Sequence, residues 1–260
     1  MSRKVSAVMR QVTAPRAYPV IVLMLGLYVI HSAYAQDAND LLAKVDESLT
    51  PTSFEAYRKI INEEPDGTKK EFVFFTVKKD RDKVAMLHLS PSSERGRATL
   101  RLGDNMWLYI PNVGRPIRIT SMQSVVGGVF NNADIMRLDY VAEYDATYAA
   151  SPEDGDEYVL DLKAKTPRVA YDHLRLRADR EPITVKTIEC YAASGTLIKT
   201  LTFSEAKDFG NGIVRPAAIE TTSPLHTGYR STMIYSGIEP RDLPDEVFTL
   251  DYMSRLSELR

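Results

Sequence analysis

The chain has 260 residues, with 33 lysines and arginines against 35 aspartates and glutamates, one cysteine and one tryptophan. An acidic balance gives no general electrostatic reason to bind nucleic acid. A single cysteine permits neither an internal disulfide nor a cysteine-rich metal site. After residue 30 no apolar run approaches the roughly 20 residues that span a bilayer, and the length suits one large domain or two small ones.

The first 35 residues show the three parts of a cleavable secretory signal. Residues 1–16 are basic and free of acids, residues 20–30 are apolar throughout, and Ala33-Tyr34-Ala35 places small residues where a signal peptidase reads. An uncleaved membrane anchor is the alternative, but the apolar run is short for one. We therefore expect cleavage after Ala35 and a single exported domain over 36–260, whose net charge is −6 because the removed segment carries four cations and no acid.

The mature chain begins with one helical pattern and continues with short strands. Residues 37–49 are predicted to form an amphipathic helix, because leucine and valine recur there at helical spacing. Connections rich in Gly, Pro, Asn or Asp, as hairpins require, then separate apolar runs at 54–62, 68–78, 83–90, 97–102, 106–111, 117–120, 183–191 and 196–204. No helix separates these strands, so we expect about ten to twelve antiparallel strands in one sheet that must curl, close or split.

Residues 121–138 break the strand pattern. Gly127-Gly128 is a hinge-like pair, and Asn131 or Asn132 can cap a short helix that carries Ile135, Met136 and Leu138. An apolar insertion of this length between strands is uncommon unless it is functional. At the C-terminus, residues 244–259 are predicted to enter a short amphipathic helix.

The strands differ in what they bury. Residues 158–163 and 173–177 alternate apolar and charged side chains, whereas 72–77 and 106–110 are apolar on both faces. An ordinary core is the plain interpretation, but few helical segments are available to fill a curved sheet. A cavity lined by Met, Phe, Leu and Val would accept acyl chains. The candidate wall and lid residues are Phe74, Trp107, Tyr109, Met122, Val126, Phe130, Ile135, Met136, Leu160 and Leu162. A strand register shifted by one residue would move the strand members to the other face.

The mature sequence offers little catalytic chemistry. His88, His173 and His226 do not have the spacing of a metal site. No nucleophile elbow, phosphate-binding loop or zinc-protease motif is present, and Cys190 has no neighbouring base. The alternative of a catalytic carboxylate pair in a cleft stays open, because acidic residues are plentiful. We predict no catalytic residue, no metal, no cofactor and no enzymatic activity.

The order of these pieces resembles a known family. The first shared features are the helix ending in Leu41-Leu42-Ala43-Lys44-Val45-Asp46, Gly96, and the strand Leu100-Arg101-Leu102-Gly103-Asp104-Asn105-Met106-Trp107-Leu108-Tyr109-Ile110-Pro111 with Arg115-Pro116-Ile117-Arg118-Ile119. The later ones are the loop ending in Asn132-Ala133-Asp134-Ile135, the pair Lys199-Thr200, and the segments Gly212-Ile213-Val214-Arg215-Pro216 and Leu243-Pro244-Asp245-Glu246-Val247-Phe248-Thr249. The mature chain is similar over nearly its whole length to the LolA-like outer membrane lipoprotein-sorting proteins of Gram-negative bacteria, in a branch broader than the best-characterised carriers. Those carriers are shorter, and their lid arginine has no matching position here.

The resemblance implies a fold and a function. The fold is mainly β with a few helices: an incompletely closed antiparallel β-barrel that wraps a hydrophobic cavity under a lid of helices and a loop. The implied function is a periplasmic carrier that binds the acyl chains of a lipoprotein or lipid. Its implied partners are an inner-membrane ABC or RND-type transporter and an outer-membrane acceptor, with no nucleic acid and no membrane span after cleavage.

Two other functions stay open from the sequence. A non-catalytic periplasmic adaptor subunit of an export pump of the RND/MMPL or ABC type would have the same strands, and a filled cavity would favour it. A hydrolase or isomerase would need an inward titratable pair, for which His88 and His173 are the likeliest bases.

Overall fold

One antiparallel sheet dominates the structure, a computed structural model that describes residues 37–49, 51–136, 139–149 and 155–260. The predicted signal peptide, residues 1–35, and Leu138 lie outside the described residues. The sheet has thirteen strands in the order β6-β5-β4-β3-β2-β1-β13-β12-β11-β10-β9-β8-β7. Because β6 and β7 are its two edges, the sheet curves without closing into a barrel, as the family resemblance implied.

The strand positions follow the turn signals closely. The strands are β1 (Phe54–Glu63), β2 (Lys69–Lys79), β3 (Lys83–Ser90), β4 (Ala98–Leu102), β5 (Asn105–Tyr109), β6 (Pro116–Ile119), β7 (Tyr144–Tyr148), β8 (Glu157–Ala164), β9 (His173–Asp179), β10 (Thr184–Tyr191), β11 (Leu197–Asp208), β12 (Val214–Thr222) and β13 (Arg230–Pro240). Nearly every strand pairs with its neighbour in sequence. The exception is the pairing of β1 with β13, which joins the two halves of the sheet.

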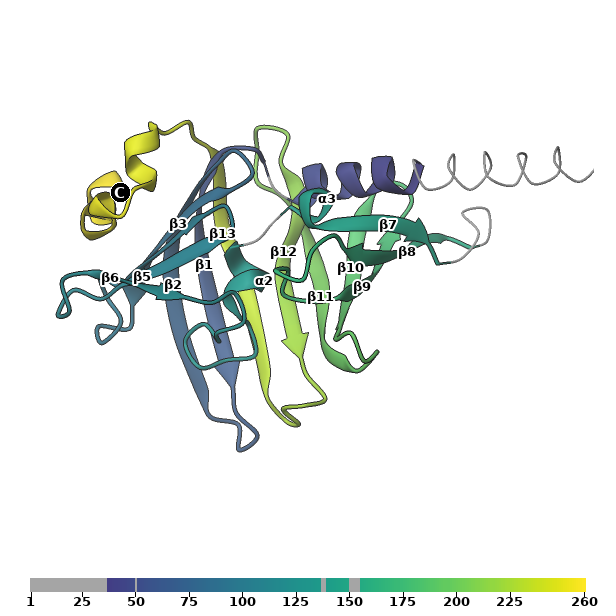
Figure 1. The fold of residues 1–260 in the computed structure, drawn as a ribbon, viewed down its shortest axis with the longest axis horizontal. Coiled ribbons are helices and arrows are strands. Elements are labelled where there is room, and N and C mark those ends of the chain that lie inside the picture. The colour runs from purple at the N-terminus through teal and green to yellow at the C-terminus, as the bar shows by residue number, and fades with distance from the viewer. Residues whose placement is uncertain (1–36, 50, 137–138, 150–154) are drawn as a thin grey trace, which may run out of the picture.

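Five helical segments accompany the sheet in the described part of the chain. The first, residues 37–49, lies beside β7 (Figure 1) and confirms the predicted helix. The others are α2 (Asn132–Met136), α3 (Tyr140–Glu143), and the 3-10 helices η1 (Asp245–Phe248) and η2 (Asp251–Leu259). The predicted cap of α2 is Asn131, whose Oδ1 accepts a hydrogen bond from the Asp134 N–H at 3.0 Å. None of the helices among the described residues is both long and apolar enough to span a membrane.

The two faces of the sheet bury different segments. We call the face toward the N-terminal helix the inner face; it holds the larger apolar cluster, to which that helix contributes Leu42 and Val45 and α2 contributes Ile135. The outer face of β2, β3 and β4 packs against the C-terminal 3-10 helices through a second cluster that includes Phe75 and Phe248. Alternation along each strand separates the clusters, so Phe74 faces inward and Phe75 outward.

Candidate functional site

Residues 120–136, the central segment, follow the end of β6, include α2 and lie across the inner face of the sheet. Val125 and Phe130 are buried in the inner apolar cluster, and the Val125 N–H donates to the Phe130 carbonyl at 2.9 Å. The chain reverses through Val126, at φ 51°, and Gly127, at φ 75°. Glycine adopts this left-handed conformation freely, but a β-branched residue does so only under strain. The reversal therefore stores strain in a segment that covers the interior.

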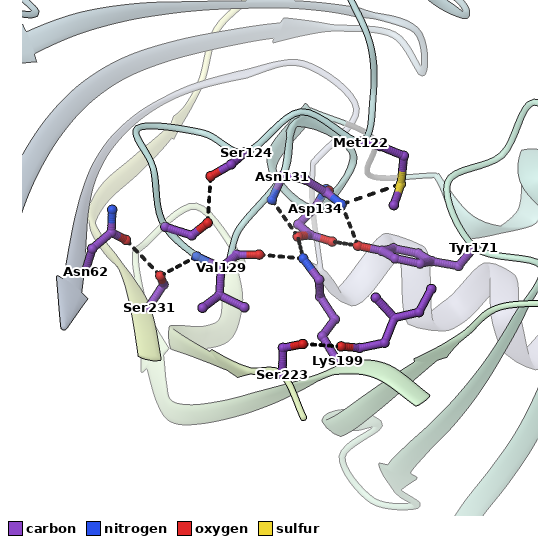
Figure 2. A network of polar contacts seen from close by, with 12 residues as sticks. Asn62, Met122, Ser124, Val129, Asn131, Asp134, Tyr171, Lys199, Ser223 and Ser231 are labelled. Carbon is purple, nitrogen blue, oxygen red and sulfur yellow. Dashed lines mark hydrogen bonds and ion pairs between the residues drawn. The ribbon is translucent and has the colours of Figure 1, made fainter. Parts of the chain in front are cut away.

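A buried ion pair holds the central segment to β11 (Figure 2). The Lys199 ammonium lies 2.8 Å from Asp134 Oδ2 and donates to the Val129 carbonyl at 2.5 Å. The side chains of Lys199 and Asp134 are only 6% and 1% exposed. The Tyr171 hydroxyl donates to the other Asp134 oxygen at 2.7 Å and accepts from the Asn131 amide at 2.8 Å. The Lys199 ammonium and both carboxylate oxygens of Asp134 thus all have partners within the protein.

A second set of hydrogen bonds holds the same segment to β1 and β13. The Ser231 hydroxyl accepts from the Val129 N–H at 2.9 Å and donates to Asn62 Oδ1 at 2.7 Å. The Asn62 amide then donates to the Val126 carbonyl at 3.1 Å. Gly128 sits directly against Asn62, because a Cβ at position 128 would lie 2.1 Å from Asn62 Oδ1. Only glycine leaves room for this approach.

Arg58 and Arg215, two of the buried arginines on the inner face, bind the main chain of the covering segments. Arg58 on β1 donates to the Ile135 carbonyl of α2 at 3.2 Å, and Arg215 on β12 donates to the Leu49 carbonyl at the end of the N-terminal helix. Their guanidinium carbons lie 5.7 Å and 4.1 Å from the centre of the Tyr235 ring. Burial raises the pKa of the Tyr235 hydroxyl, but Arg215 and Arg58 outweigh it and leave that pKa below its usual value.

Two cavities flank the central segment. The β3 cavity, of about 520 Å³, lies between residues 123–127 and the half of the sheet that includes Phe72, His88 and Leu108. The β11 cavity, of about 450 Å³, lies on the other side, against Ile198 and Lys199. Both include Ser124 and Gly127 in their walls. Deeper in the apolar interior, beside Asp134 and Tyr140, lie two spaces of only about 20 Å³ each. The inner face is therefore closely packed at these two places.

The structure brings most of the predicted wall and lid residues together. The six that are fully buried in the inner cluster are Phe74, Phe130, Ile135, Met136, Leu160 and Leu162. Val126 packs against that cluster and lines the β3 cavity, and Met122 is 47% exposed and lines the β11 cavity.

Two predicted residues lie elsewhere. Trp107 and Tyr109 on β5 pack against the outer cluster beneath the C-terminal 3-10 helices. The inward residues of β5 are Met106, which joins the inner cluster, and Leu108, which lines the β3 cavity. The cause is the period of two along a strand, by which a shift of one residue exchanges the faces. When every residue of a strand is apolar, the sequence does not show which alternate residues face inward.

Sequence reasoning missed the polar side chains that hold the central segment. Arg58 occupies an inward position of β1, whose residues alternate between buried and half-buried. Lys199 has the same parity as Leu201 on β11, and both are buried. The sequence signal that could have found them is a charged residue at the alternate strand positions that otherwise hold buried apolar residues. Among the described residues, no three His, Cys, Asp or Glu side chains gather as metal ligands do.

A pair of carboxyl groups joins the N-terminal helix to α3. Asp46 accepts hydrogen bonds from the Tyr140 and Val141 N–H groups at 3.1 Å and 2.9 Å. Burial raises the pKa of Asp46 to about 7 against those two hydrogen bonds, and the Asp139 carboxyl contributes to the rise. The folded-state pKa lies above the unfolded value of 3.8, so this group stabilises the fold fully below that value. The contribution is lost as the pH rises through about 7.

We therefore expect Asp139→Asn to reduce the loss of thermal stability between about pH 4 and about pH 7, the interval between the unfolded and folded pKa values of Asp46. The amide removes a like charge beside Asp46 and keeps an oxygen that can accept from the Ala142 N–H, as Asp139 Oδ1 does at 3.0 Å. The measurement is the midpoint of thermal unfolding of parent and variant across this range. Asp145→Asn, at an exposed carboxylate of β7, is the control. Parallel curves for parent and Asp139→Asn would contradict the assignment.

Comparisons with known proteins agree with this fold. A family model described as "Uncharacterized protein" matches residues 80–255. The crystal structure of a LolA superfamily protein from Nitrosomonas europaea is 31% identical, with a TM-score of 0.76, and the match covers 83% of this chain and 98% of that one. No curated protein matches the chain.

Two further crystal structures share the fold at lower identity. A putative outer membrane lipoprotein-sorting protein domain from Vibrio parahaemolyticus is 18% identical, with a TM-score of 0.72, over 85% of this chain and 100% of that one. A DUF1329 family protein from Desulfovibrio piger is 20% identical, with a TM-score of 0.74, over 85% of this chain and 99% of that one.

The class of this protein is defined by its open, curved antiparallel sheet, whose apolar inner face lies under helices and a loop. The chain belongs to the LolA superfamily.

Proposed function

We propose that the protein is a non-catalytic periplasmic carrier that binds the acyl chains of a lipidated protein or a lipid on the inner face of its sheet. The observation that carries the proposal is the way this face is covered. Its walls are apolar over both halves of the sheet, from Phe74 to Leu162. Its cover is the central segment, which lies on it through the polar contacts of Lys199, Ser231 and Arg58. The central segment therefore acts as a lid.

The energetics fit reversible carriage. Burying acyl chains gains about 0.8 kcal/mol per CH₂, so a carrier that releases its cargo needs an opposing cost. Here that cost is the displacement of Phe130 and Ile135 and the opening of the Lys199–Asp134 pair. The strained conformation of Val126 lowers the barrier to leaving the closed state. The β3 and β11 cavities mark where the segment already stands away from the sheet.

The lipoprotein-sorting name of the Vibrio relative supports the cargo class. With the proposed signal peptide removed after Ala35, the carrier would work in the periplasm. It would receive cargo from an inner-membrane ABC or RND-type transporter and pass it to an outer-membrane acceptor. In both transfers the lid would open on contact with a partner.

One observation favours a second function, that of a non-catalytic adaptor subunit of an export pump. Beneath the central segment lie two spaces of only about 20 Å³ each, so the interior is closely packed there. A carrier must open that interior, whereas an adaptor keeps it closed and uses the outside of the sheet. The two candidates therefore differ in whether the protein takes up an acyl chain.

We expect protein exported with its own signal and purified natively from the periplasm to begin at Gln36 and to contain extractable lipid. Intact-mass measurement checks the first residue, and mass spectrometry of an organic extract checks the second. After lipid removal, the protein should take up a fluorescent fatty-acyl probe and become more stable to heat when it does. An empty preparation that takes up no probe but retains an inner-membrane pump in a pull-down would instead establish the adaptor.

A further inference from the structure

The β3 cavity contains one buried polar atom that nothing in the described structure satisfies. His88 is 5% exposed and lines this cavity, and its Nδ1 has no hydrogen-bond partner among the described residues. A buried polar group without a partner costs roughly 1–3 kcal/mol. The cost is recovered when a ligand supplies the missing hydrogen bond.

An irregularity in the pairing of β2 and β3 places His88 at this position. The register of β2 and β3 shifts between Val73 and Phe74, so that Phe74 lies opposite His88 and Val73 opposite Ser90. Such an irregularity re-aims a side chain at the end of a strand. The Phe74 ring then meets the imidazole edge-on, with ring centres 4.8 Å apart. The contact with the Phe74 ring thus restricts the orientation of the imidazole.

The other residues that line the cavity are partly apolar and partly polar. The apolar part is formed by Phe72, Leu108, Ile119, Val125 and Val126. Among these, Phe72 and Val125 belong to the inner apolar cluster, so this part leads to the proposed acyl site.

The three polar side chains that the central segment contributes to the wall, Gln123, Ser124 and Asn132, already bond within that segment. The Gln123 amide oxygen accepts from the Thr120 N–H at 3.0 Å, and the Asn132 amide donates to the Thr120 carbonyl at 2.9 Å.

The cavity is electrically neutral. Its two charged lining residues, Glu94 and Arg97, pair with each other at 2.6 Å. Burial, together with the Arg97 charge, lowers the pKa of His88 to about 4, so the imidazole is uncharged near neutral pH. An anionic head group would lie beside Glu94, and a cationic one beside Arg97. An uncharged group that forms a hydrogen bond fits without breaking the pair.

We infer that the β3 cavity binds the uncharged hydroxyl- or ester-bearing head region of an acylated cargo, with the hydrogen bond made by His88 Nδ1. The inference rests on the proposed carrier function and specifies the class of lipid that the carrier prefers. The acyl chain would extend from the apolar wall past Val125 into the inner face. The volume of about 520 Å³ lies in the range of small-molecule sites, which runs from about 300 to about 1,000 Å³.

The test compares monoolein and oleate, which share one acyl chain and differ in the charge of the head group. Each displaces a fluorescent fatty-acyl probe from delipidated protein. We expect the parent to bind monoolein about tenfold more tightly than oleate, the effect of one buried hydrogen bond. His88→Phe keeps a ring against Phe74 but removes the nitrogen, so it should lose about tenfold for monoolein and less than twofold for oleate.

Two further variants keep the result interpretable. His88→Gln restores a hydrogen-bonding group and should recover most of the monoolein affinity, which a general packing defect would not allow. His173→Phe replaces a half-buried histidine that lies 3.3 Å from Asp161 on β8, and it should bind both lipids as the parent does.

The outcomes separate the two proposals. Probe binding without preference for monoolein, or with a preference that His88→Phe leaves unchanged, would overturn the inference while the carrier stands. Failure of the parent to bind any probe would overturn the carrier, and the inference with it.

Discussion

Replacing Lys199 with methionine should lower the free energy of unfolding by about 3 kcal/mol, because it leaves the Asp134 carboxylate buried without its cation. The pair is nearly inaccessible to water, so solvent does not compensate the remaining charge. The midpoint of thermal unfolding should fall by roughly 6–12 °C in a domain of this size. The same change weakens the hold on the central segment, so the rate of acyl-probe uptake should rise.

A matched control is available on the same half of the sheet. Lys186 pairs with Glu157 and Asp179, but its side chain is 45% exposed. Lys186→Met should therefore change stability by less than about 0.5 kcal/mol. Adding Asp134→Asn to Lys199→Met should recover part of the lost stability, because the amide carries no charge. Additive losses in the double variant would show that the pair is not coupled.

Gly128→Ala is expected to loosen the lid by a steric route. The new methyl group would lie 2.1 Å from Asn62 Oδ1, so the Asn62 side chain must leave its contacts with Ser231 and Val126. Overpacking of this kind costs about 1–3 kcal/mol. Probe uptake should become faster and thermal stability should fall, as measured by stopped-flow fluorescence and calorimetry.

Two variants identify the cause of that effect. Gly237→Ala, on β13, places its methyl group where no heavy atom lies within 4 Å, so it should behave as the parent. In an Asn62→Ala background, Gly128→Ala should add little, because the side chain it displaces is gone. An equal loss in both backgrounds would assign the effect to the backbone at position 128 and remove Asn62 from the lid anchor.

Together the two predictions concern opposite sides of one segment. Lys199 holds it from β11, and Asn62 holds it from β1 with the help of Ser231 on β13. If the segment is a lid, loosening either side should accelerate uptake, and the carrier predicts the same direction for both. The adaptor predicts lower stability without any uptake.

The sequence identified the elements because their signals are local. The turn at residues 64–67 separates two strands whose observed bounds, Phe54–Glu63 and Lys69–Lys79, differ by only a residue from those expected. The loss of alternation after residue 120 marked the central segment, since a loop that covers a sheet has no reason to keep a period of two. The helix at 37–49 was readable from its apolar stripe for the same reason.

The positions of the candidate wall and lid residues were only partly readable. Phe130 and Ile135 were correctly expected to face the interior, because large apolar side chains in a covering loop must face the core. Trp107 and Tyr109 were placed with them although they face outward, because a strand that is apolar on both sides leaves its parity undetermined. The sequence offered His88 only as a base for an alternative enzyme, and its missing partner becomes visible only when the surrounding cavity is known.

By itself, the sequence determined the class of fold, an antiparallel sheet with a separate apolar cover, because hydrophobic period and turn residues act over a few positions along the chain. Only the tertiary structure decided which charged groups close that cover. Lys199 and Asp134 are 65 residues apart, and Arg58 and Ile135 are 77 apart. Contacts at such separations depend on how the whole sheet curves and on which strands pair, and no local pattern encodes them. The β3 cavity likewise exists only in the folded protein, because its wall joins His88 of β3 to residues 123–127 of the central segment.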